Sequence, residues 1–311
     1  MLRIFHGTKF DFLKLNKVAA GAAVVVVLGA LASMLVLGMR YSIEFTGGTL
    51  VQVEFTTAPD VTALRGALAT AGVPDAEITS FGSPTEFTIR AQDAAAVETQ
   101  AAGAEGVATR IEAGLQAFAP GAHTVVRTEA VGPRVGEELS RNAMIAVLIS
   151  LCITLAYLAW RFETRLGAAA VAATAFGVFG VLTLIKILDL EISLTVIAGL
   201  LTVIGYSLND TIIIFDRVRE NLLKLKKTPL YDVLNISINE TLPRSVLTHG
   251  TTLSATLALL LLGGEVIRPF AIVMTFGVLV GTFGSMVVAP SLLVWIEQKY
   301  PRAAAASGAK A

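Results

Sequence analysis

Six almost uncharged stretches of about 20 residues recur along this 311-residue sequence. The hydrocarbon core of a bilayer is about 30 Å thick and a helix rises about 1.5 Å per residue, so about 20 apolar residues can cross it. The six stretches are residues 18–38, 143–160, 166–185, 192–215, 245–264 and 269–296. They predict an α-helical integral membrane protein with six transmembrane helices.

The composition agrees with a membrane class and argues against an ordinary cytosolic enzyme. Only 15% of the residues are charged, against about 25% in soluble domains, and 54% are hydrophobic. The single cysteine, Cys152, cannot form an intrachain disulfide. We expect no catalytic residue, no metal and no cofactor, because no His/Cys cluster or nucleophile–base pair is present. No basic cluster is interleaved with aromatic residues, so we expect no nucleic-acid partner.

The distribution of Lys and Arg predicts the orientation of the helices. Fifteen basic residues lie in the N-terminus, the first short connection, residues 216–244 and the C-terminal tail, whereas the opposite short connections hold one each. By the positive-inside rule both termini are cytoplasmic. The predicted divisions are a cytoplasmic N-terminus 1–17, a first helix 18–38, an extracytoplasmic domain 39–142, a five-helix bundle 143–296 with a cytoplasmic loop 216–244, and a cytoplasmic tail 297–311. We expect helix 18–38 to remain uncleaved, since it is too long for a signal peptide.

Residues 39–142 have the polarity of a small folded domain. Alternation over 50–55 predicts a strand, and Asp60 is a suitable N-cap for a helix over 61–71. Two short strands, 77–81 and 86–91, are expected on either side of a turn at 82–84, followed by a helix within 93–118 and a strand over 123–131. The order βαββαβ predicts a ferredoxin-like α+β domain. Gly47 and Gly48 are expected to permit a close backbone approach.

Asp210 is the strongest functional candidate, because a carboxylate inside an apolar span costs roughly 2.5 to 3.5 kcal/mol on insertion scales. Such residues usually face a cavity or a partner. Ser207 and Asn209 beside it are expected to form a polar lining, with Ser207 on the same face. The alternative is that the span ends early and Asp210 lies at the cytoplasmic interface.

Arg244 opens the fifth span and is the second candidate. Thr248 and Thr251 follow it at helical spacing and Thr252 lies beside them, which suggests a polar stripe. The alternative is an arginine that reaches cytoplasmic water, with threonines bonded to their own backbone. His249 is offset from this stripe and is interpreted as a packed histidine.

Two further features concern packing and the membrane surface. Gly277 and Gly281 form a small-xxx-small pair that permits close helix packing. Residues 217–243 are expected to form amphipathic helices lying on the cytoplasmic surface, with lysines suited to anionic lipid.

Four segments carry a family resemblance: residues 43–48 (IEFTGG), 131–136 (VGPRVG), 205–221 (GYSLNDTIIIFDRVREN) and 239–252 (NETLPRSVLTHGTT). Together they resemble the SecF family, the smaller half of the SecDF auxiliary subunits of the bacterial Sec protein translocase. The likeness covers nearly the whole chain. One departure is Glu44, where the family often has Asp.

The resemblance implies a function and a set of partners. It implies membership in the resistance–nodulation–division superfamily, in which two six-span halves, SecD and SecF, pack pseudosymmetrically in the bacterial cytoplasmic membrane. Proton flow would drive movements of the outer domains that pull polypeptide outward. Asp210 and Arg244 match the family's transmembrane carboxylate and arginine. The implied partners are SecD, the SecYEG channel, unfolded polypeptide, protons and membrane lipid.

Two other functions remain possible at the level of sequence. One is a small-molecule proton antiporter of the same superfamily. It would need a substrate pocket in the outer domain, and residues 40–141 form a small domain for such a pocket. The other is a purely structural translocase subunit that conducts no protons.

Overall fold

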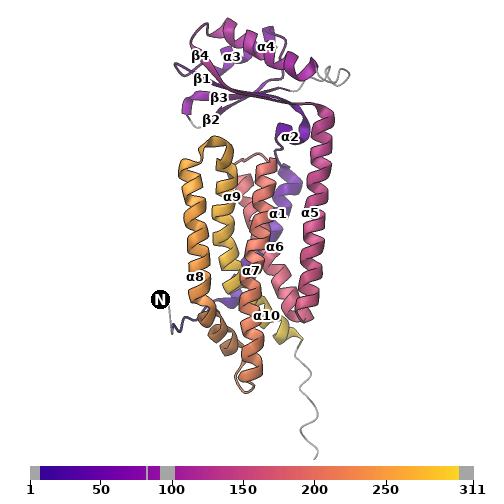
Figure 1. Ribbon diagram of the computed structural model, residues 1–311, viewed down its shortest axis with the longest axis vertical. Helices are drawn as coiled ribbons and strands as arrows, with labels where there is room; N and C mark the ends of the chain where they lie inside the picture. Colours follow the sequence, from indigo (N-terminus) through magenta and orange to yellow (C-terminus); the bar gives the residue numbers. More distant parts are fainter. Residues whose placement is uncertain (1–7, 82, 92–101, 301–311) are drawn as a thin grey trace, which may run out of the picture. The chain divides into compact units, whose positions relative to one another are not determined.

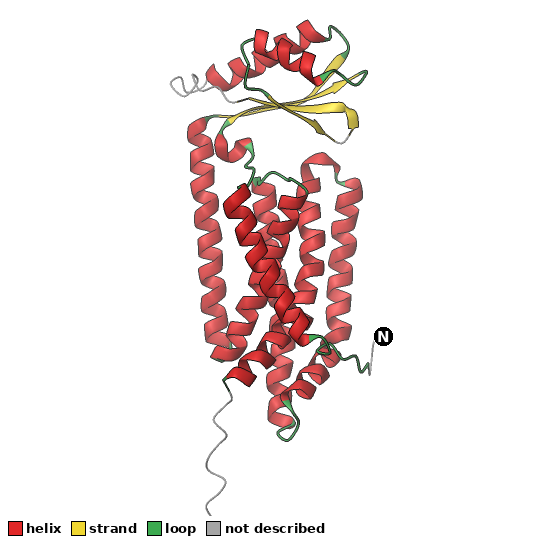
Figure 2. Cartoon of the chain, turned by 180° about the vertical axis from the view of Figure 1, so that it is seen from behind, coloured by secondary structure: helices red, strands yellow, loops and turns green. Residues whose placement is uncertain are grey.

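The computed structural model describes residues 8–81, 83–91 and 102–300. The chain divides into two compact units: Met1–Arg40 with Val147–Ala311, and Tyr41–Ala146. Among the described residues, strands occur only in the second unit (Figure 2). We call the first the helical unit and the second the sheet unit.

The sheet unit has the predicted ferredoxin-like order of elements. Its strands are β1 (Gly48–Phe55), β2 (Glu77–Phe81), β3 (Ser83–Ala91) and β4 (His123–Val131), and its helices are α2 (Ile43–Thr46), α3 (Val61–Thr70) and α4 (Ala102–Phe118). The strand order is β2-β3-β1-β4, and every neighbouring pair is antiparallel. Helices α3 and α4 cover one face of the sheet (Figure 1).

The core of the sheet unit follows the alternation of β1. Val51, Val53 and Phe55 are buried on the face that packs against α3 and α4. The side chain of Asp60 accepts a hydrogen bond from the amide of Thr62 at 2.8 Å, which confirms the predicted N-cap of α3.

The predicted turn at 82–84 needs a correction, because Ser83 and Pro84 belong to β3. The β2–β3 register shifts between Ser80, which pairs with Phe87, and Phe81, which pairs with Ser83. Pro84 therefore lies in a bulge, where the missing amide hydrogen removes no ladder bond. Of the predicted helix within 93–118, residues 93–101 lie outside the described residues.

In the described part of the chain, six helical stretches are long and apolar enough to cross a membrane, which confirms the predicted architecture. They are α1 (Asn16–Leu37), α5 (Pro133–Arg161), α6 (Thr164–Ile187), α7 (Leu194–Lys224), α8 (Leu230–Leu262), and a last stretch made of α9 (Gly264–Phe283), a π-helical segment (Gly284–Val288) and α10 (Ala289–Lys299). The boundary between the two units falls within α5.

The helices of the helical unit differ in how much they bury. Half of the apolar stretch of α6 is buried, but only 11% of that of α5 and 17% of that of α8. Helices α6, α7 and α9 therefore form the centre of the unit. Helices α1, α5 and α8 present apolar side chains outward.

The predicted cytoplasmic loop 216–244 is helical over most of its length. Helix α7 continues to Lys224 and α8 begins at Leu230, so the expected helices are present, and Pro243 lies inside α8. Helix α8 changes direction in its lower part in Figure 1. Val218, Leu234 and Ile238 are fully buried and belong to the hydrophobic core of the unit. The position of this segment on the membrane surface stays a prediction.

Candidate functional site: a buried carboxyl held by three helices

Asp210 lies on the buried face of α7 and is only 4% exposed. Ser207, one turn earlier, is buried on the same face, whereas Asn209 is exposed on another face. Asn209 therefore does not line the site around Asp210. Asp210 lies near the middle of α7, with apolar residues before and after it along the helix.

Two serine hydroxyls from other helical segments meet the carboxyl group. Ser245 of α8 donates to Oδ1 of Asp210 at 2.6 Å, and Ser285 of the π-helical segment contacts Oδ2. Both serines are at most 1% exposed. Asp210 thus joins three segments that are far apart in sequence.

The hydroxyl of Ser285 has two acceptors within reach. Besides Oδ2 of Asp210, it lies 3.0 Å from the carbonyl oxygen of Thr282. A hydroxyl has one hydrogen and cannot donate fully to two acceptors at once. The hydrogen of Ser285 is therefore shared between the carboxyl of Asp210 and the backbone of its own helix.

The π-helical segment explains how Ser285 reaches the site. A π turn inserts an extra residue into a helix and rotates the side chains that follow, and such turns occur often at functional sites. Gly284, at its start, packs against the carbonyl of Ala173 in α6. The turn therefore directs Ser285 toward α7.

His249 is the nearest basic group to the carboxyl. Its Nε2 lies 3.8 Å from Oδ2 of Asp210, and both side chains are at most 10% exposed. The ring of Tyr206 packs against the imidazole, with 5.4 Å between the centroids. The expectation that His249 is simply a packed histidine missed this position beside Asp210.

Helix α8 carries two adjacent polar stripes, and the inner one meets Asp210. Ser245, His249 and Thr256 are buried on the face toward α7 and α9. Arg244 and Thr251 are exposed on the neighbouring face, and Thr248 and Thr252 are half-buried. Within the described part of the chain no ion pair joins Arg244 to Asp210. The hydroxyls of Thr248 and Thr251 donate to carbonyls of their own helix.

Reasoning from the sequence missed Ser245, His249 and Ser285. Ser245 and His249 are one helical turn apart, so their spacing alone predicts that they share one face of the helix, next to the face of Arg244. Ser285 follows Asp210 by 75 residues, and no local pattern connects them.

Close packing of α7 against α9 depends on glycine, as the small-xxx-small pair predicted. A Cβ added at Gly277 would lie 2.2 Å from a methyl group of Val203, and one at Gly281 would lie 3.1 Å from Cβ of Ser207. Ser207 is thereby enclosed, and its hydroxyl has no hydrogen-bond partner among the described residues.

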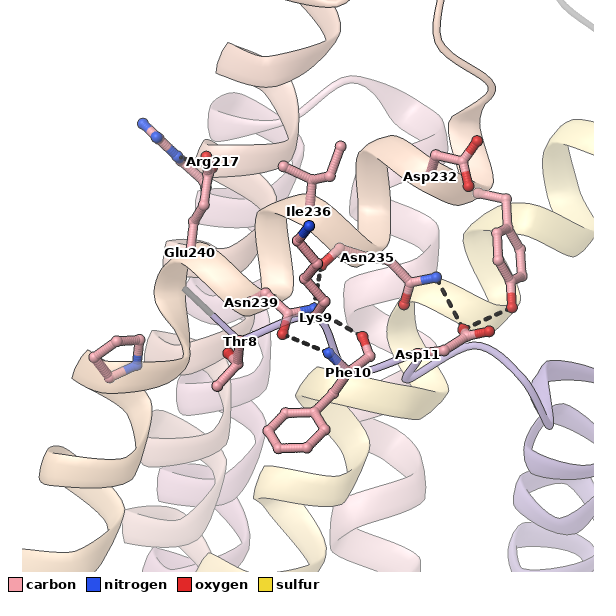
Figure 3. A pocket seen from close by; sticks show the side chains of 12 residues that line it. Thr8, Lys9, Phe10, Asp11, Arg217, Asp232, Asn235, Ile236, Asn239 and Glu240 are labelled. Atoms are coloured by element: carbon pink, nitrogen blue, oxygen red, sulfur yellow. Dashed lines mark hydrogen bonds and ion pairs between the residues drawn. The ribbon is translucent and has the colours of Figure 1, made fainter. Parts of the chain in front are cut away.

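A second polar region lies where the N-terminal arm meets α8 (Figure 3). Asp11 accepts hydrogen bonds from Tyr231 at 2.7 Å and from Asn235 at 2.9 Å, and Asn239 bonds both backbone groups of Phe10. A pocket of about 920 Å³ opens beside this arm. The hydrogen bond from Tyr231 is the main reason why the pKa of Asp11 is lowered, against the opposing effect of burial.

The groups around Asp210 are ones that can bind and release protons. Among the described residues no group of three or more His, Cys, Asp or Glu side chains could hold a metal ion. The site offers one carboxyl, one imidazole and hydroxyl groups, which exchange protons and form hydrogen bonds.

Two family descriptions match the chain. Residues 110–299 match the family described as "Protein export membrane protein SecD/SecF, C-terminal", and residues 32–59 match the "SecD/SecF GG Motif". The second match includes Gly47, which has a positive φ and whose added Cβ would lie 3.1 Å from the backbone of Pro133. The predicted close approach at the glycine pair is therefore confirmed.

Several named relatives are similar over nearly their full length. A protein translocase subunit SecF of Gemmatimonas aurantiaca is 56% identical, with 100% of this chain and 94% of the relative covered. A protein of the same name from Escherichia coli O157:H7 is 36% identical, with 94% and 90% covered. The crystal structure of SecDF, a translocon-associated membrane protein from Thermus thermophilus, is similar with a TM-score of 0.81 and 37% identity over 94% of this chain. This chain covers only 39% of that SecDF chain.

Proposed function

The chain belongs to the SecD/SecF family of protein export membrane proteins, and from this premise we propose that it acts with SecD to couple the proton motive force to polypeptide export by the Sec translocase. It is a multi-pass membrane protein and a transport subunit. The observation that carries proton coupling is the burial of Asp210 between hydroxyl groups of two other helical segments.

The proposed cycle alternates between a protonated and an ionised Asp210. Desolvation favours the neutral carboxyl, whereas a nearby positive charge favours the ionised one. In this conformation Asp210 is proposed to carry the proton, because the carboxyl is buried and Arg244 lies on another face of α8. In the other state Arg244 approaches Asp210 and favours loss of the proton. Ser207, on the same face of α7 as Asp210, and Thr248, Thr251 and Thr252 of α8 are proposed to supply polar groups along the path of the proton.

The free energy released by one proton crossing the membrane is large enough to drive a conformational change of the subunit. A proton that crosses the whole membrane yields about 2.3 kcal/mol per 100 mV of potential. That free energy shifts a two-state equilibrium by more than tenfold. It is less than the about 5–15 kcal/mol needed to unfold a typical domain. The proposed work is therefore the stepwise movement of a chain that is already unfolded.

The partner SecD is proposed to cover the outward faces of the helical unit. The similarity of 94% of this chain to part of a SecDF structure supports this partner. The outward apolar side chains of α1 and α5 and the exposed Arg244 stripe of α8 suit such a partner. We further propose the SecYEG channel as a partner, surrounding lipid, and a bacterial cytoplasmic membrane with both termini cytoplasmic.

The sheet unit is proposed to contact the exported polypeptide. Its edge strands β2 and β4 each have one side that pairs with no other described strand. An extended chain can add to such an edge through main-chain hydrogen bonds, with little dependence on its sequence. That property suits a subunit that must accept many different cargoes.

Asp210→Asn tests the proposal in membranes that contain SecD, SecYEG and this subunit. Export driven by the membrane potential should fall to the level seen without a potential, while assembly stays normal. Asp232→Asn, which changes an exposed carboxyl in the first turn of α8, is the matched control. Full stimulation in Asp210→Asn would refute proton coupling at this site and favour a purely structural subunit.

A further inference from the structure

The buried site contains a second titratable group that the proposed cycle does not use. His249 lies on the same face of α8 as Ser245, one helical turn away, and points its Nε2 toward Asp210. It is 8% exposed, and its Nδ1 has no hydrogen-bond partner within the described part of the chain. A buried imidazole without such partners is uncommon in a purely structural role, because an unmet polar atom costs about 1–3 kcal/mol.

The surroundings of His249 leave Asp210 as its ionisable partner. From α7 it faces Tyr206 and Asp210. A pocket of about 490 Å³ borders its other side, and α9, the π-helical segment and the N-terminal arm contribute no ionisable side chain to the pocket wall. The described residues therefore offer the imidazole one carboxyl and one phenol.

The net charge of the site also favours Asp210 and His249 as a pair. An ionised carboxyl buried without a counter-charge is strongly disfavoured, and Arg244 lies on another face in this conformation. Asp210 and His249 have zero net charge both as a neutral pair and as carboxylate with imidazolium. A proton can therefore pass between them without creating net charge in the membrane.

We propose that His249 is the proton-exchanging partner of Asp210. The O–H bond at Oδ2 of Asp210 breaks, the lone pair of Nε2 takes the proton, and a carboxylate and an imidazolium result. The two atoms must approach from 3.8 Å to hydrogen-bond distance, a movement of roughly 1 Å. A small shift of α8 against α7 can supply it, so the proton transfer is linked to helix movement.

This inference rests on the proposed function, in which Asp210 carries the proton. The two can be tested separately, because proton sharing between two side chains is visible without export. Full-length subunit in its complex with SecD, in lipid vesicles, is labelled with ¹⁵N-histidine and titrated by solid-state NMR. The sequence contains three histidines, so His249→Gln assigns the signal of His249.

Asp210→Asn should weaken proton binding by His249 at least tenfold, because the imidazolium loses the carboxylate that stabilises it. His123 in the sheet unit bonds the carbonyl of Ala119 and serves as the internal control, whose titration should not change. An unchanged titration of His249 in Asp210→Asn would overturn the inference.

A second measurement connects the pair to transport. His249→Gln should displace the pH dependence of potential-driven export by one pH unit or more, while Asp210→Asn abolishes the stimulation. An unaltered pH profile in His249→Gln would also contradict the inference. If Asp210→Asn left export stimulated but still changed the titration of His249, the proton pair would stand and the proposed function would fail.

Discussion

The hydroxyl of Ser245 lies 2.6 Å from Oδ1 of Asp210, so the residue next to Arg244 contacts the buried carboxyl while Arg244 itself is exposed. Successive side chains of a helix differ by about 100° in direction. A rotation of α8 of that size would exchange one residue for the other at Asp210. The contact between Ser245 and Asp210 therefore represents one arrangement of α8, and the proposed cycle adds a second, in which Arg244 faces Asp210.

Ser245→Ala should strengthen proton binding by Asp210 about tenfold. The hydroxyl donates to the carboxyl and so stabilises its ionised form, by about 1.5–3 kcal/mol for a charged acceptor. Infrared difference spectroscopy of the assembled complex measures the carboxyl band against pH. Ser254→Ala, on the same helix but bonded to the carbonyl of Gly250, is the control.

Ser285→Ala should act in the same direction and strengthen proton binding by Asp210. Its hydroxyl donates to Oδ2 and so stabilises the ionised carboxyl, with its hydrogen shared with the carbonyl of Thr282. The same titration checks this sign. Weaker proton binding in Ser285→Ala would show that Ser285 accepts a hydrogen bond from Asp210 instead.

Arg244→Lys should damage export but leave the stability of the chain almost unchanged. The exposed guanidinium has no ion pair with Asp210 here, and surface substitutions usually change stability by less than about 0.5 kcal/mol. Lysine keeps the charge but loses the planar set of donors. Export and thermal unfolding are measured together, with the exposed Arg219→Lys as control. Normal export in Arg244→Lys would reduce Arg244 to an interfacial anchor.

Gly277→Ala should lower stability by about 1–3 kcal/mol, the usual range for overpacking. The new methyl group would overlap the side chain of Val203 at 2.2 Å. Adding Val203→Ala should restore part of the loss, because it removes the overlapping group. Gly250→Ala, whose methyl group meets no atom within 4 Å, should be neutral or stabilising. Thermal unfolding in detergent ranks the four proteins.

Asp11→Ala should release the N-terminal arm at neutral pH. The lowered pKa of Asp11 means that the contact with Tyr231 stabilises the folded state above the usual value of 3.8 and is lost as the pH falls through the lower folded value. The arm should therefore be fully held at pH 7. Trypsin cleavage after Lys9 and Lys14 measures its release, with Asp232→Ala as control. Equal cleavage in wild type and Asp11→Ala would contradict the role of this contact.

Much of the fold could be read from hydrophobic periodicity. A bilayer requires long apolar helices whatever their neighbours, so the six spans were recognisable from composition alone. The alternation in β1 and the capping aspartate Asp60 are likewise local signals, and both matched the structure. The helices expected within 216–244 are present, but the burial of Val218 and Ile238 could not be predicted, because these residues join a core formed by elements distant in sequence.

In the candidate site, Asp210 could be predicted from the sequence, but its partners could not. A carboxyl in an apolar span is conspicuous in any sequence, because its cost does not depend on its partners. Which side chains meet it depends on the rotation of α8, on the glycine-mediated approach of α9, and on the π turn that directs Ser285. Arg244, Ser245 and His249 are all polar residues near the start of one span, and their spacing does not tell which face packs inward. Packing of several helices at once selects that face, since the buried face must fill space and satisfy its hydrogen bonds together.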